Sequence, residues 1–257
     1  MVNQRKDGLG GSMPRFYLSN PVIEEGRLRI EGPEVRHIRR VLRLKKGEEI
    51  VLINGQEKEY RGIIVEQGTH RITVQIEQIL SIQRESPLEI TIAQSLLKGE
   101  KMDYFIQKAT ELGVTRIVPF FSSRSVPLLD KSKRLSRHRR WQRIAIEASK
   151  QCGRVRVPEV IPLQEFSEML QLPPPGACRL ILWEKEKRGL KNFLKESKCE
   201  REIFFIVGPE GGFSEGEIEN AKKSGFIPIG LGERILRAET AGLCLLSILQ
   251  YEWGDIG

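Results

Sequence analysis

The sequence predicts an α/β protein in which a small β-rich domain precedes a larger domain built on a parallel sheet. From about residue 89 onward, short apolar strands alternate with helices, which is typical of a sheet covered by helices on both faces. Before residue 81, short alternating segments separated by turn residues indicate half-buried strands. The polar residues 81–88 are expected to link the two domains.

The smaller domain is expected to span residues 13–80. Its predicted strands are residues 49–53, 60–65 and 71–76. Asn54-Gly55 is a typical hairpin turn between the first two strands. The one helical stretch, residues 33–44, places its apolar side chains on one face and its arginines on the other.

The larger domain is expected to span residues 89–257. Its short apolar segments suit the buried centre of a parallel sheet, and they are residues 90–93, 116–119, 180–183, 203–207 and 226–229. Helical periodicity predicts helices at residues 101–112, 138–152 and 238–251.

The positive charge of the chain is concentrated in two segments. The formal net charge is +8, and residues 124–156 hold eleven Lys or Arg against two acidic residues. Residues 36–46 hold six more Lys or Arg. Solvated helix faces are the alternative interpretation, but two such clusters favour contact with RNA or DNA.

Several classes of protein do not fit this sequence. No apolar run approaches the roughly 18 residues of a membrane span. Residues 1–12 lack the apolar core of a signal peptide, so we interpret them as a flexible arm or a vector-derived remnant. The four cysteines have no C-x-x-C spacing and there are three histidines, which argues against a zinc site or a disulfide framework. We therefore expect a cytoplasmic protein with no metal and no membrane partner.

Two glycine-rich segments near the C-terminus carry the functional signal. Residues 207–217 run from an apolar strand through three glycines to Ser214 and Glu217, which have the spacing of a capping box. Residues 229–241 again run from a strand through glycines into a helix. Such turns let backbone amides approach a ligand at the sheet edge where ligands usually bind. Ordinary tight turns are the alternative, but two such segments one strand apart favour a shared ligand site.

The common ligand motifs do not identify that ligand. The chain has no G-x-x-x-x-G-K-[ST] phosphate loop and no G-x-G-x-x-G after the first strand of the larger domain. It also lacks the G-x-S-x-G motif of a nucleophilic serine. These absences argue against nucleotide hydrolysis, dinucleotide binding and serine hydrolase chemistry.

The two glycine-rich segments, residues 208–214 and 231–241, closely resemble the SPOUT superfamily of knotted RNA methyltransferases. More narrowly, the sequence is similar to the ribosomal RNA small subunit methyltransferase E family. Further segments match as well, and the resemblance covers nearly everything from Met13 to the end. These segments are residues 13–17, 37–43, 98–102, 106–114 and 151–154.

The resemblance implies a fold, a reaction and partners. The first domain would be a PUA-like β-barrel that binds RNA, and the second a SPOUT methyltransferase domain with a trefoil knot. The protein would use S-adenosylmethionine to methylate N3 of a uridine in 16S ribosomal RNA, within a small ribosomal subunit. It would act as a homodimer.

The reaction that the resemblance implies gives several residues candidate roles, and the resemblance itself supplies those that bind the methyl donor. Arg237 is the candidate for orienting the uracil and favouring its anion, and Glu239 for accepting its proton; a purely structural pairing of the two is the alternative. Candidate RNA phosphate contacts are Arg15, Arg39, Arg40, Arg43 and Arg154. The residues expected to bind the methyl donor are Leu182, Glu184, Gly208, Pro209, Glu210, Gly211, Gly230, Leu231, Gly232, Ile235, Leu236, Thr240 and Ala241.

Two other functions remain open from the sequence. One is an RNA-binding ribosome-assembly factor that keeps the basic clusters and the barrel but does not catalyse a reaction. The other is a related methyltransferase that acts on transfer RNA or on a ribose 2′-hydroxyl. Binding of the methyl donor separates the first from our interpretation, and the chemical identity of the product separates the second.

Overall fold

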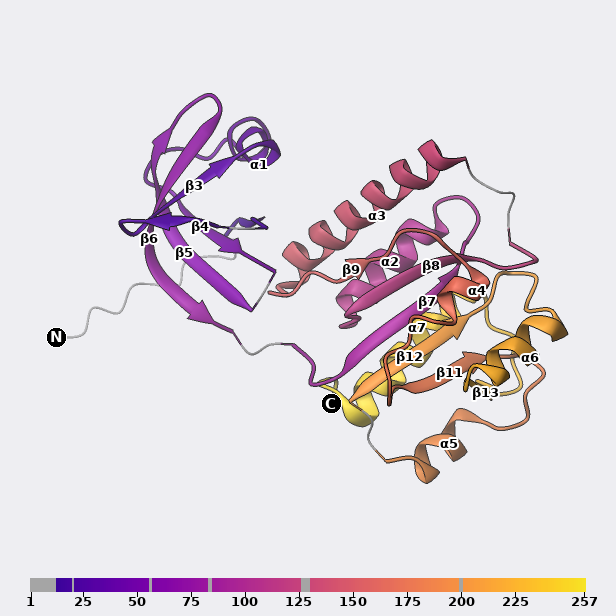
Figure 1. Ribbon diagram of the computed structural model, residues 1–257. Coiled ribbons are helices and arrows are strands. Elements are labelled where there is room, and N and C mark those ends of the chain that lie inside the picture. Colours follow the sequence, from indigo (N-terminus) through magenta and orange to yellow (C-terminus); the bar gives the residue numbers. More distant parts are fainter. Residues whose placement is uncertain (1–12, 20, 56, 83–84, 126–129, 199–200) are drawn as a thin grey trace. The chain divides into compact units, whose positions relative to one another are not determined.

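The computed structural model describes residues 13–19, 21–55, 57–82, 85–125, 130–198 and 201–257 (Figure 1). The chain forms two compact units that divide between residues 83 and 84. The arm expected at residues 1–12 lies outside the described residues, as does part of the expected linker.

The N-terminal unit contains a six-stranded sheet in the order β1-β4-β5-β6-β3-β2. Strand β1 pairs in parallel with β4, and the other neighbours are antiparallel. The three predicted strands correspond to β4, β5 and β6, whereas β1 to β3 are too short to show a period in the sequence. The strands are β1 (Arg15–Tyr17), β2 (Ile23–Glu24), β3 (Arg27–Glu31), β4 (Glu49–Ile53), β5 (Lys58–Gln67) and β6 (Arg71–Ser81).

The predicted helix over residues 33–44 is shorter and irregular in the structure. One turn of α-helix, α1 (Pro33–Arg36), continues into a π-helix, η1 (His37–Val41). Val35 and Ile38 are buried in the core of the unit, so the opposite face carries the exposed arginines. Turns of π-helix are rare and frequently occur at functional sites. The exposed arginines of this face are Arg36, Arg39 and Arg40.

The C-terminal unit is built on a parallel sheet in the order β10-β8-β7-β12-β11-β13, with β9 beside β8. The predicted α/β fold class is confirmed. The short strands β9 and β10 were not expected from the sequence. The strands are β7 (Glu89–Ser95), β8 (Arg116–Phe121), β9 (Glu159–Val160), β10 (Gln164–Glu165), β11 (Cys178–Leu182), β12 (Glu202–Val207) and β13 (Ile227–Ile229).

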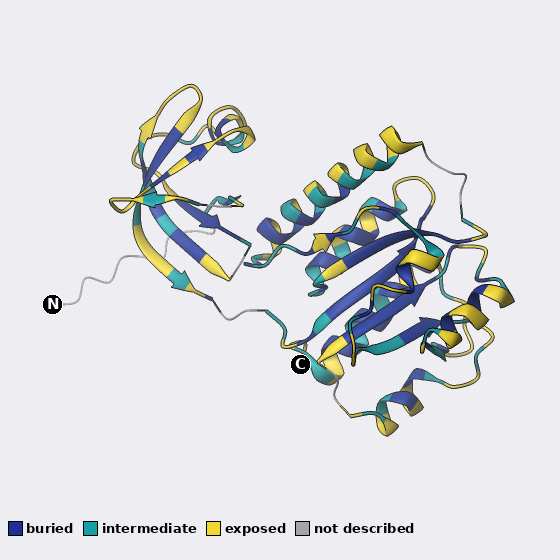
Figure 2. Cartoon of the chain, viewed as in Figure 1, coloured by how far each residue is buried: buried dark blue, intermediate teal, exposed yellow. Residues whose placement is uncertain are grey.

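Helices cover both faces of this sheet, and Figure 2 shows its central strands as buried. One apolar cluster joins the sheet to α2, α3, α5 and α7, and a second joins it to α4 and α6. Helix α3 begins seven residues earlier than predicted, because Asp130 caps it by accepting a hydrogen bond from the Lys133 amide. The helices are α2 (Lys101–Glu111), α3 (Lys131–Cys152), α4 (Phe166–Met169), α5 (Leu190–Glu196), α6 (Glu215–Lys223) and α7 (Ala238–Trp253).

The strand order places the two glycine-rich segments near each other. Strand β11 lies between β12 and β13 and pairs in parallel with both, so the carboxyl ends of all three strands meet at one edge of the sheet. Across the described residues, no helix has the length and apolar character needed to cross a membrane. The same residues contain no group of three side chains that could hold a metal ion.

Candidate functional site

A cavity of about 340 Å³ lies where β11, β12 and β13 end, and we call it the strand-end pocket. Its walls are residues 182–184, 207–213 and 229–236, each following one strand, together with Ala238 and Ala241 of helix α7. Ligands of open α/β sheets usually bind beyond the carboxyl ends of the strands. The pocket therefore occupies the place where a ligand is expected.

The residues that the sequence assigns to a methyl donor come together here with one exception. Thr240 is exposed in the first turn of α7 and does not line the pocket. The lining includes Leu182, Glu184, Gly208, Pro209, Glu210, Gly211, Gly230, Leu231, Gly232, Ile235, Leu236 and Ala241.

Gly230 holds the loop after β13 against the loop after β11. Its amide donates to the Arg188 carbonyl at 2.9 Å, and its own carbonyl accepts from the Leu190 amide at 3.0 Å. A Cβ atom at position 230 would lie 2.6 Å from the Glu186 carbonyl oxygen, which is closer than real Cβ atoms approach. The two loops can therefore meet in this way only with glycine at this position.

The loop after β12 is held from its other side by the segment after β8. Arg124 Nη1 donates to the Gly211 carbonyl at 3.0 Å, and the Ser123 amide and hydroxyl donate to the Glu217 carboxylate at 2.9 and 2.8 Å. Glu217 also accepts from the Ser214 amide, as the predicted capping box requires. Burial alone would raise the pKa of Glu217, but the hydrogen bonds from Ser123 and Ser214 hold it below its ordinary value.

The two candidate catalytic residues flank Ala238 at the start of α7, and neither lines the pocket. Arg237 is the exposed N-cap residue of that helix. Glu239 has a side chain that is 12% exposed, and its Oε1 lies 3.3 Å from Lys101 Nζ. The ion pair seen in the structure thus joins Glu239 to Lys101 and not to Arg237. Lys101 lies in the family-like segment 98–102, but only the fold brings α2 beside α7.

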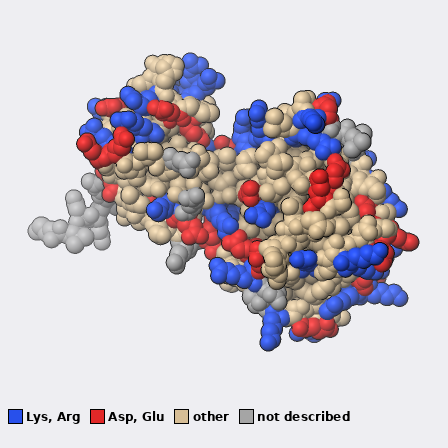
Figure 3. Space-filling model, in the orientation of Figure 1, with Lys and Arg blue, Asp and Glu red and all other residues tan. Residues whose placement is uncertain are grey.

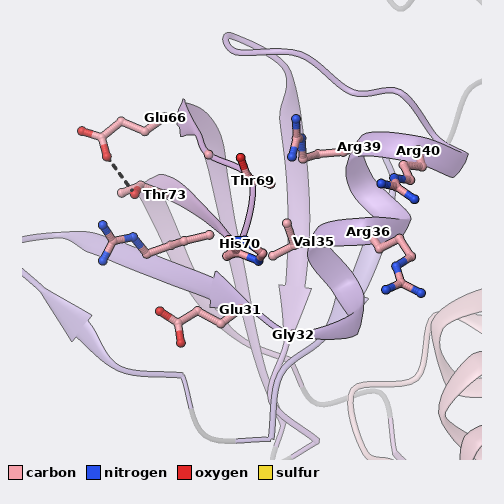
Figure 4. Close-up of a pocket in the computed structure, with 12 residues that line it drawn as sticks. Glu31, Gly32, Val35, Arg36, Arg39, Arg40, Glu66, Thr69, His70 and Thr73 are labelled. Carbon is pink, nitrogen blue, oxygen red and sulfur yellow. Dashed lines mark hydrogen bonds between the residues drawn. The ribbon is translucent and has the colours of Figure 1, made fainter.

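A second cavity, of about 750 Å³, lies between the α1–η1 segment and the β5–β6 turn, and we call it the barrel groove (Figure 4). Arg36, Arg39 and Arg40 line its helical side, and Thr69 and His70 come from the turn opposite. In the part of the chain that the structure describes, these three arginines form no ion pair. Their guanidinium groups are therefore available to an anion.

The candidate phosphate contacts fall into two groups. Arg39 and Arg40 line the barrel groove, and Arg43 is exposed just after η1. Arg15 instead points its guanidinium at the fully buried Glu59 carboxylate, 2.9 Å away, and its side chain is 16% exposed. The Glu59 carboxylate also accepts a hydrogen bond from Arg61. Arg15 therefore neutralises a charge inside the N-terminal unit.

Arg154 has a structural part in place of the phosphate contact expected from the sequence. Its side chain is 8% exposed, and its Nε and Nη2 donate to Glu85 at 2.9 and 2.7 Å. Its Nη1 donates to the carbonyls of Thr110 and Val114 at 2.9 and 2.8 Å. A buried guanidinium with its donors paired in this way cannot reach an external phosphate without breaking the ion pair.

The basic cluster of residues 124–156 lies mostly on α3, where Figure 3 shows Lys and Arg side chains on the surface. Part of it is already neutralised, since Arg134, Arg140 and Lys150 pair with Glu165, Asp103 and Glu147. The exposed remainder includes Lys131, Arg139 and Arg143. The free positive charge of this helix is smaller than the sequence count indicates.

Two family models match the chain in the order of its units. Residues 84–250 match an RNA methyltransferase domain, and residues 30–77 match an RNA methyltransferase PUA domain. A ribosomal RNA small subunit methyltransferase E from Bacillus subtilis is 33% identical over 248 residues, which are 93% of this chain and 97% of that protein.

Solved structures agree with these matches. A ribosomal RNA small subunit methyltransferase E from Neisseria gonorrhoeae, bound to S-adenosyl methionine, superposes with a TM-score of 0.87 at 36% identity. The match covers 96% of this chain and 100% of that one. A Legionella pneumophila methyltransferase in complex with the same cofactor gives a TM-score of 0.87 at 34% identity, with the same coverage of both chains.

Proposed function

Because the chain belongs to the ribosomal RNA small subunit methyltransferase E family, we propose that it transfers a methyl group from S-adenosylmethionine to N3 of a uridine in 16S ribosomal RNA. The strand-end pocket carries this proposal. Its lining is almost the complete set of residues that the family resemblance assigns to the methyl donor.

The residues of the pocket fit such a donor. Gly208 and Gly230 have no side chain to fill the pocket that they line, and Leu182 and Leu231 offer apolar surface for an adenine ring. The carboxylates of Glu184 and Glu210 suit the ammonium group and the sulfonium centre of the donor. When bound, S-adenosylmethionine supplies an activated methyl group on a sulfonium centre. The chain itself must hold the donor, align the acceptor nitrogen with it and exclude water.

The residues proposed to act on the acceptor base lie at the start of α7. N3 of uracil lies on the Watson–Crick edge and carries a proton, so the base must be unpaired before it reacts. Arg237, exposed between two pocket-lining residues, orients the uracil and stabilises its anion in this proposal. Glu239 accepts the proton, directly or through water. Its Oε2 is buried and accepts no hydrogen bond within the described residues, which leaves it a free lone pair.

The barrel groove and the segment beside it supply the RNA contacts in this proposal. Arg39, Arg40 and Arg43 would contact phosphates, with Arg36 added from the structure. The RNA partner would be 16S ribosomal RNA in a small ribosomal subunit, and the enzyme would be a cytoplasmic homodimer. The trefoil knot that the family implies also stays a prediction.

Nucleoside mass spectrometry tests the proposed reaction. Purified protein is incubated with isotopically labelled S-adenosylmethionine and unmodified 16S ribosomal RNA, free or within small subunits, with bulk transfer RNA as the comparison substrate. We expect labelled 3-methyluridine from the ribosomal RNA. A 2′-O-methylated nucleoside, or label in transfer RNA alone, would overturn the proposal. RNA binding without donor binding by calorimetry would favour an assembly factor.

A further inference from the structure

We infer that Lys101 is a positioning residue for methyl transfer, because its ammonium group links one glycine-rich loop of the strand-end pocket to the helix that begins where the other loop ends. The inference rests on the proposed function, since it concerns how the pocket holds the donor. Lys101 itself does not line the pocket, and it acts through two carboxylates.

Lys101 is the first residue of α2, and its Nζ reaches two other elements. It lies 3.6 Å from Glu210 Oε1 and 3.3 Å from Glu239 Oε1. Glu210 belongs to the loop after β12, which forms one wall of the pocket. Glu239 lies in the first turn of α7, directly after the loop that forms the other wall. One ammonium group therefore connects the first wall to the helix that directly follows the second wall.

The turn before α2 strengthens this connection. The Lys98 amide donates to Glu210 Oε1 at 3.3 Å, so the same carboxylate oxygen meets the backbone of the turn and the Lys101 side chain. Burial opposes ionisation of Glu210, but its hydrogen bonds to backbone amides, including that of Lys98, and the Lys101 charge hold its pKa below the ordinary value. Glu210 is therefore ionised at neutral pH, and the contact with Lys101 is a true ion pair.

The arrangement differs from an ordinary surface ion pair, which usually contributes little. Two carboxylates converge on one cation, so its removal leaves Glu210 and Glu239 near each other without a counter-charge. The other Glu239 oxygen is buried and accepts no hydrogen bond from the described residues. Lys101 is thus the polar contact that sets the orientation of the Glu239 carboxylate.

A fixed distance between the walls matters for the reaction. The acceptor nitrogen must meet the methyl group in line, and displacement by about 1 Å can cost about 100-fold in rate. Loosening the two walls should therefore lower kcat as well as donor affinity. If Lys101 merely stabilised α2, its replacement would change neither kcat nor donor affinity in the folded protein.

The test compares Lys101→Met with Lys108→Met. Lys108 is a matched control, because it lies on the same helix, is similarly exposed (34% against 36%) and pairs with Glu111 at 2.8 Å. For Lys101→Met we expect the Kd of S-adenosylmethionine, measured by calorimetry, to rise about five-fold. We expect kcat on 16S ribosomal RNA to fall about ten-fold. Lys101→Arg should keep most of the donor affinity and most of kcat, and Lys108→Met should match the unmodified chain in both quantities.

A double-mutant cycle identifies the route of the effect. In a Glu210→Gln background, Lys101→Met should raise the Kd by a smaller factor than in the unmodified chain, because its partner charge is already gone. Thermal unfolding monitors folding of each variant, and Lys101→Gln serves as a second neutral variant if Lys101→Met unfolds.

The outcomes separate this inference from the proposed function. Equal Kd and kcat for Lys101→Met and the unmodified chain would overturn the inference and leave the proposed function standing. Equal losses in Lys101→Met and Lys108→Met would overturn it as well, by assigning the effect to α2 in general. An unmodified chain that neither binds the donor nor methylates RNA would instead overturn the proposed function.

Discussion

The strand-end pocket and the barrel groove differ in the segments that form them. The pocket is formed by glycine-rich loops that follow three neighbouring parallel strands, so its shape is set by the buried sheet beneath it. The groove is lined by long arginine side chains on an exposed helical face. One added atom should therefore impair donor binding at the pocket, whereas RNA binding at the groove should weaken gradually as charges are removed.

The same contrast separates arginines that resemble one another in the sequence. Arg39 and Arg154 were both candidate phosphate contacts, but Arg39 lines the groove and Arg154 is buried in an ion pair. Removal of a buried arginine with paired donors destabilises the fold, whereas an exposed arginine contributes to binding of a polyanion. Substitutions that disturb a buried contact should therefore have larger effects than substitutions in the groove.

Arg154→Met should destabilise the C-terminal unit by about 3 kcal/mol, because it leaves the Glu85 carboxylate buried without its partner. All three tryptophans of the chain, residues 141, 183 and 253, belong to this unit, so urea unfolding followed by tryptophan fluorescence reports on it alone. Arg156→Met is the control, since the nearby Arg156–Glu89 pair is over a third exposed. If Arg154→Met instead keeps full stability but flattens the salt dependence of RNA binding, Arg154 is a phosphate contact.

Gly230→Ala should lower kcat/KM for methyl transfer by about 100-fold, because the new Cβ atom pushes the loop after β13 away from the Glu186 carbonyl. Gly216→Ala in α6 is the matched control, since a Cβ atom there would meet no neighbour within 4 Å. Filter-binding of labelled RNA should give the same affinity for both variants. Equal kinetics for Gly230→Ala and Gly216→Ala would show that close contact of the loops is not needed.

The sequence predicts the lining of the pocket better than the set of exposed arginines for a physical reason. Local patterns show where an apolar strand ends and a glycine-rich turn begins, and parallel strands bring such turns to one edge of the sheet. The positions of Gly208, Gly230 and Leu182 follow from this rule and from the family resemblance. The burial of Arg154 does not, because its partner Glu85 lies 69 residues away in the chain.

Other missed features have the same origin in contacts distant along the chain. Nothing near Lys101 in the sequence indicates that its ammonium group meets Glu239, which lies in the last helix. Ser123 and Glu217 likewise belong to separate strand–helix units that the sheet brings together. The early start of α3 has a different cause. Asp130 is a residue type that favours the N-cap position, but the prediction followed the apolar pattern, which begins only near residue 138.

Replacing three arginines of the groove region, Arg39, Arg40 and Arg43, by Gln should weaken RNA binding by about ten-fold and flatten the salt dependence. Each phosphate contact that is lost should reduce the slope of log K against log salt concentration by about 0.7 for single-stranded RNA. Arg29→Gln is the control, because Arg29 is exposed on the same unit but pairs with Glu24 at 3.5 Å. An unchanged slope in the triple variant would remove the groove from the RNA interface. Calorimetry with S-adenosylmethionine should give an unchanged Kd.

The smallest expected effect is a pH-dependent one, at the cap that ends the loop after β12. The pKa of Glu217 is lower in the folded chain than its ordinary value of 4.5, since hydrogen bonds from Ser123 and Ser214 outweigh the effect of burial. The stabilisation from this carboxylate is therefore complete above pH 4.5 and is lost as the pH falls through the folded-state pKa.

Glu217→Gln should accordingly cost about 1 kcal/mol of stability of the C-terminal unit at neutral pH. The difference from the unmodified chain should shrink as the medium becomes acidic, because the unmodified carboxylate then becomes protonated too. Glu219→Gln is the control on the same helix, where Glu219 is 60% exposed and pairs with Lys222. A difference that stays constant from neutral to acid pH would mean that Glu217 acts through its shape and not its charge. RNA binding at the barrel groove should be indifferent to this substitution, because Glu217 belongs to the other unit.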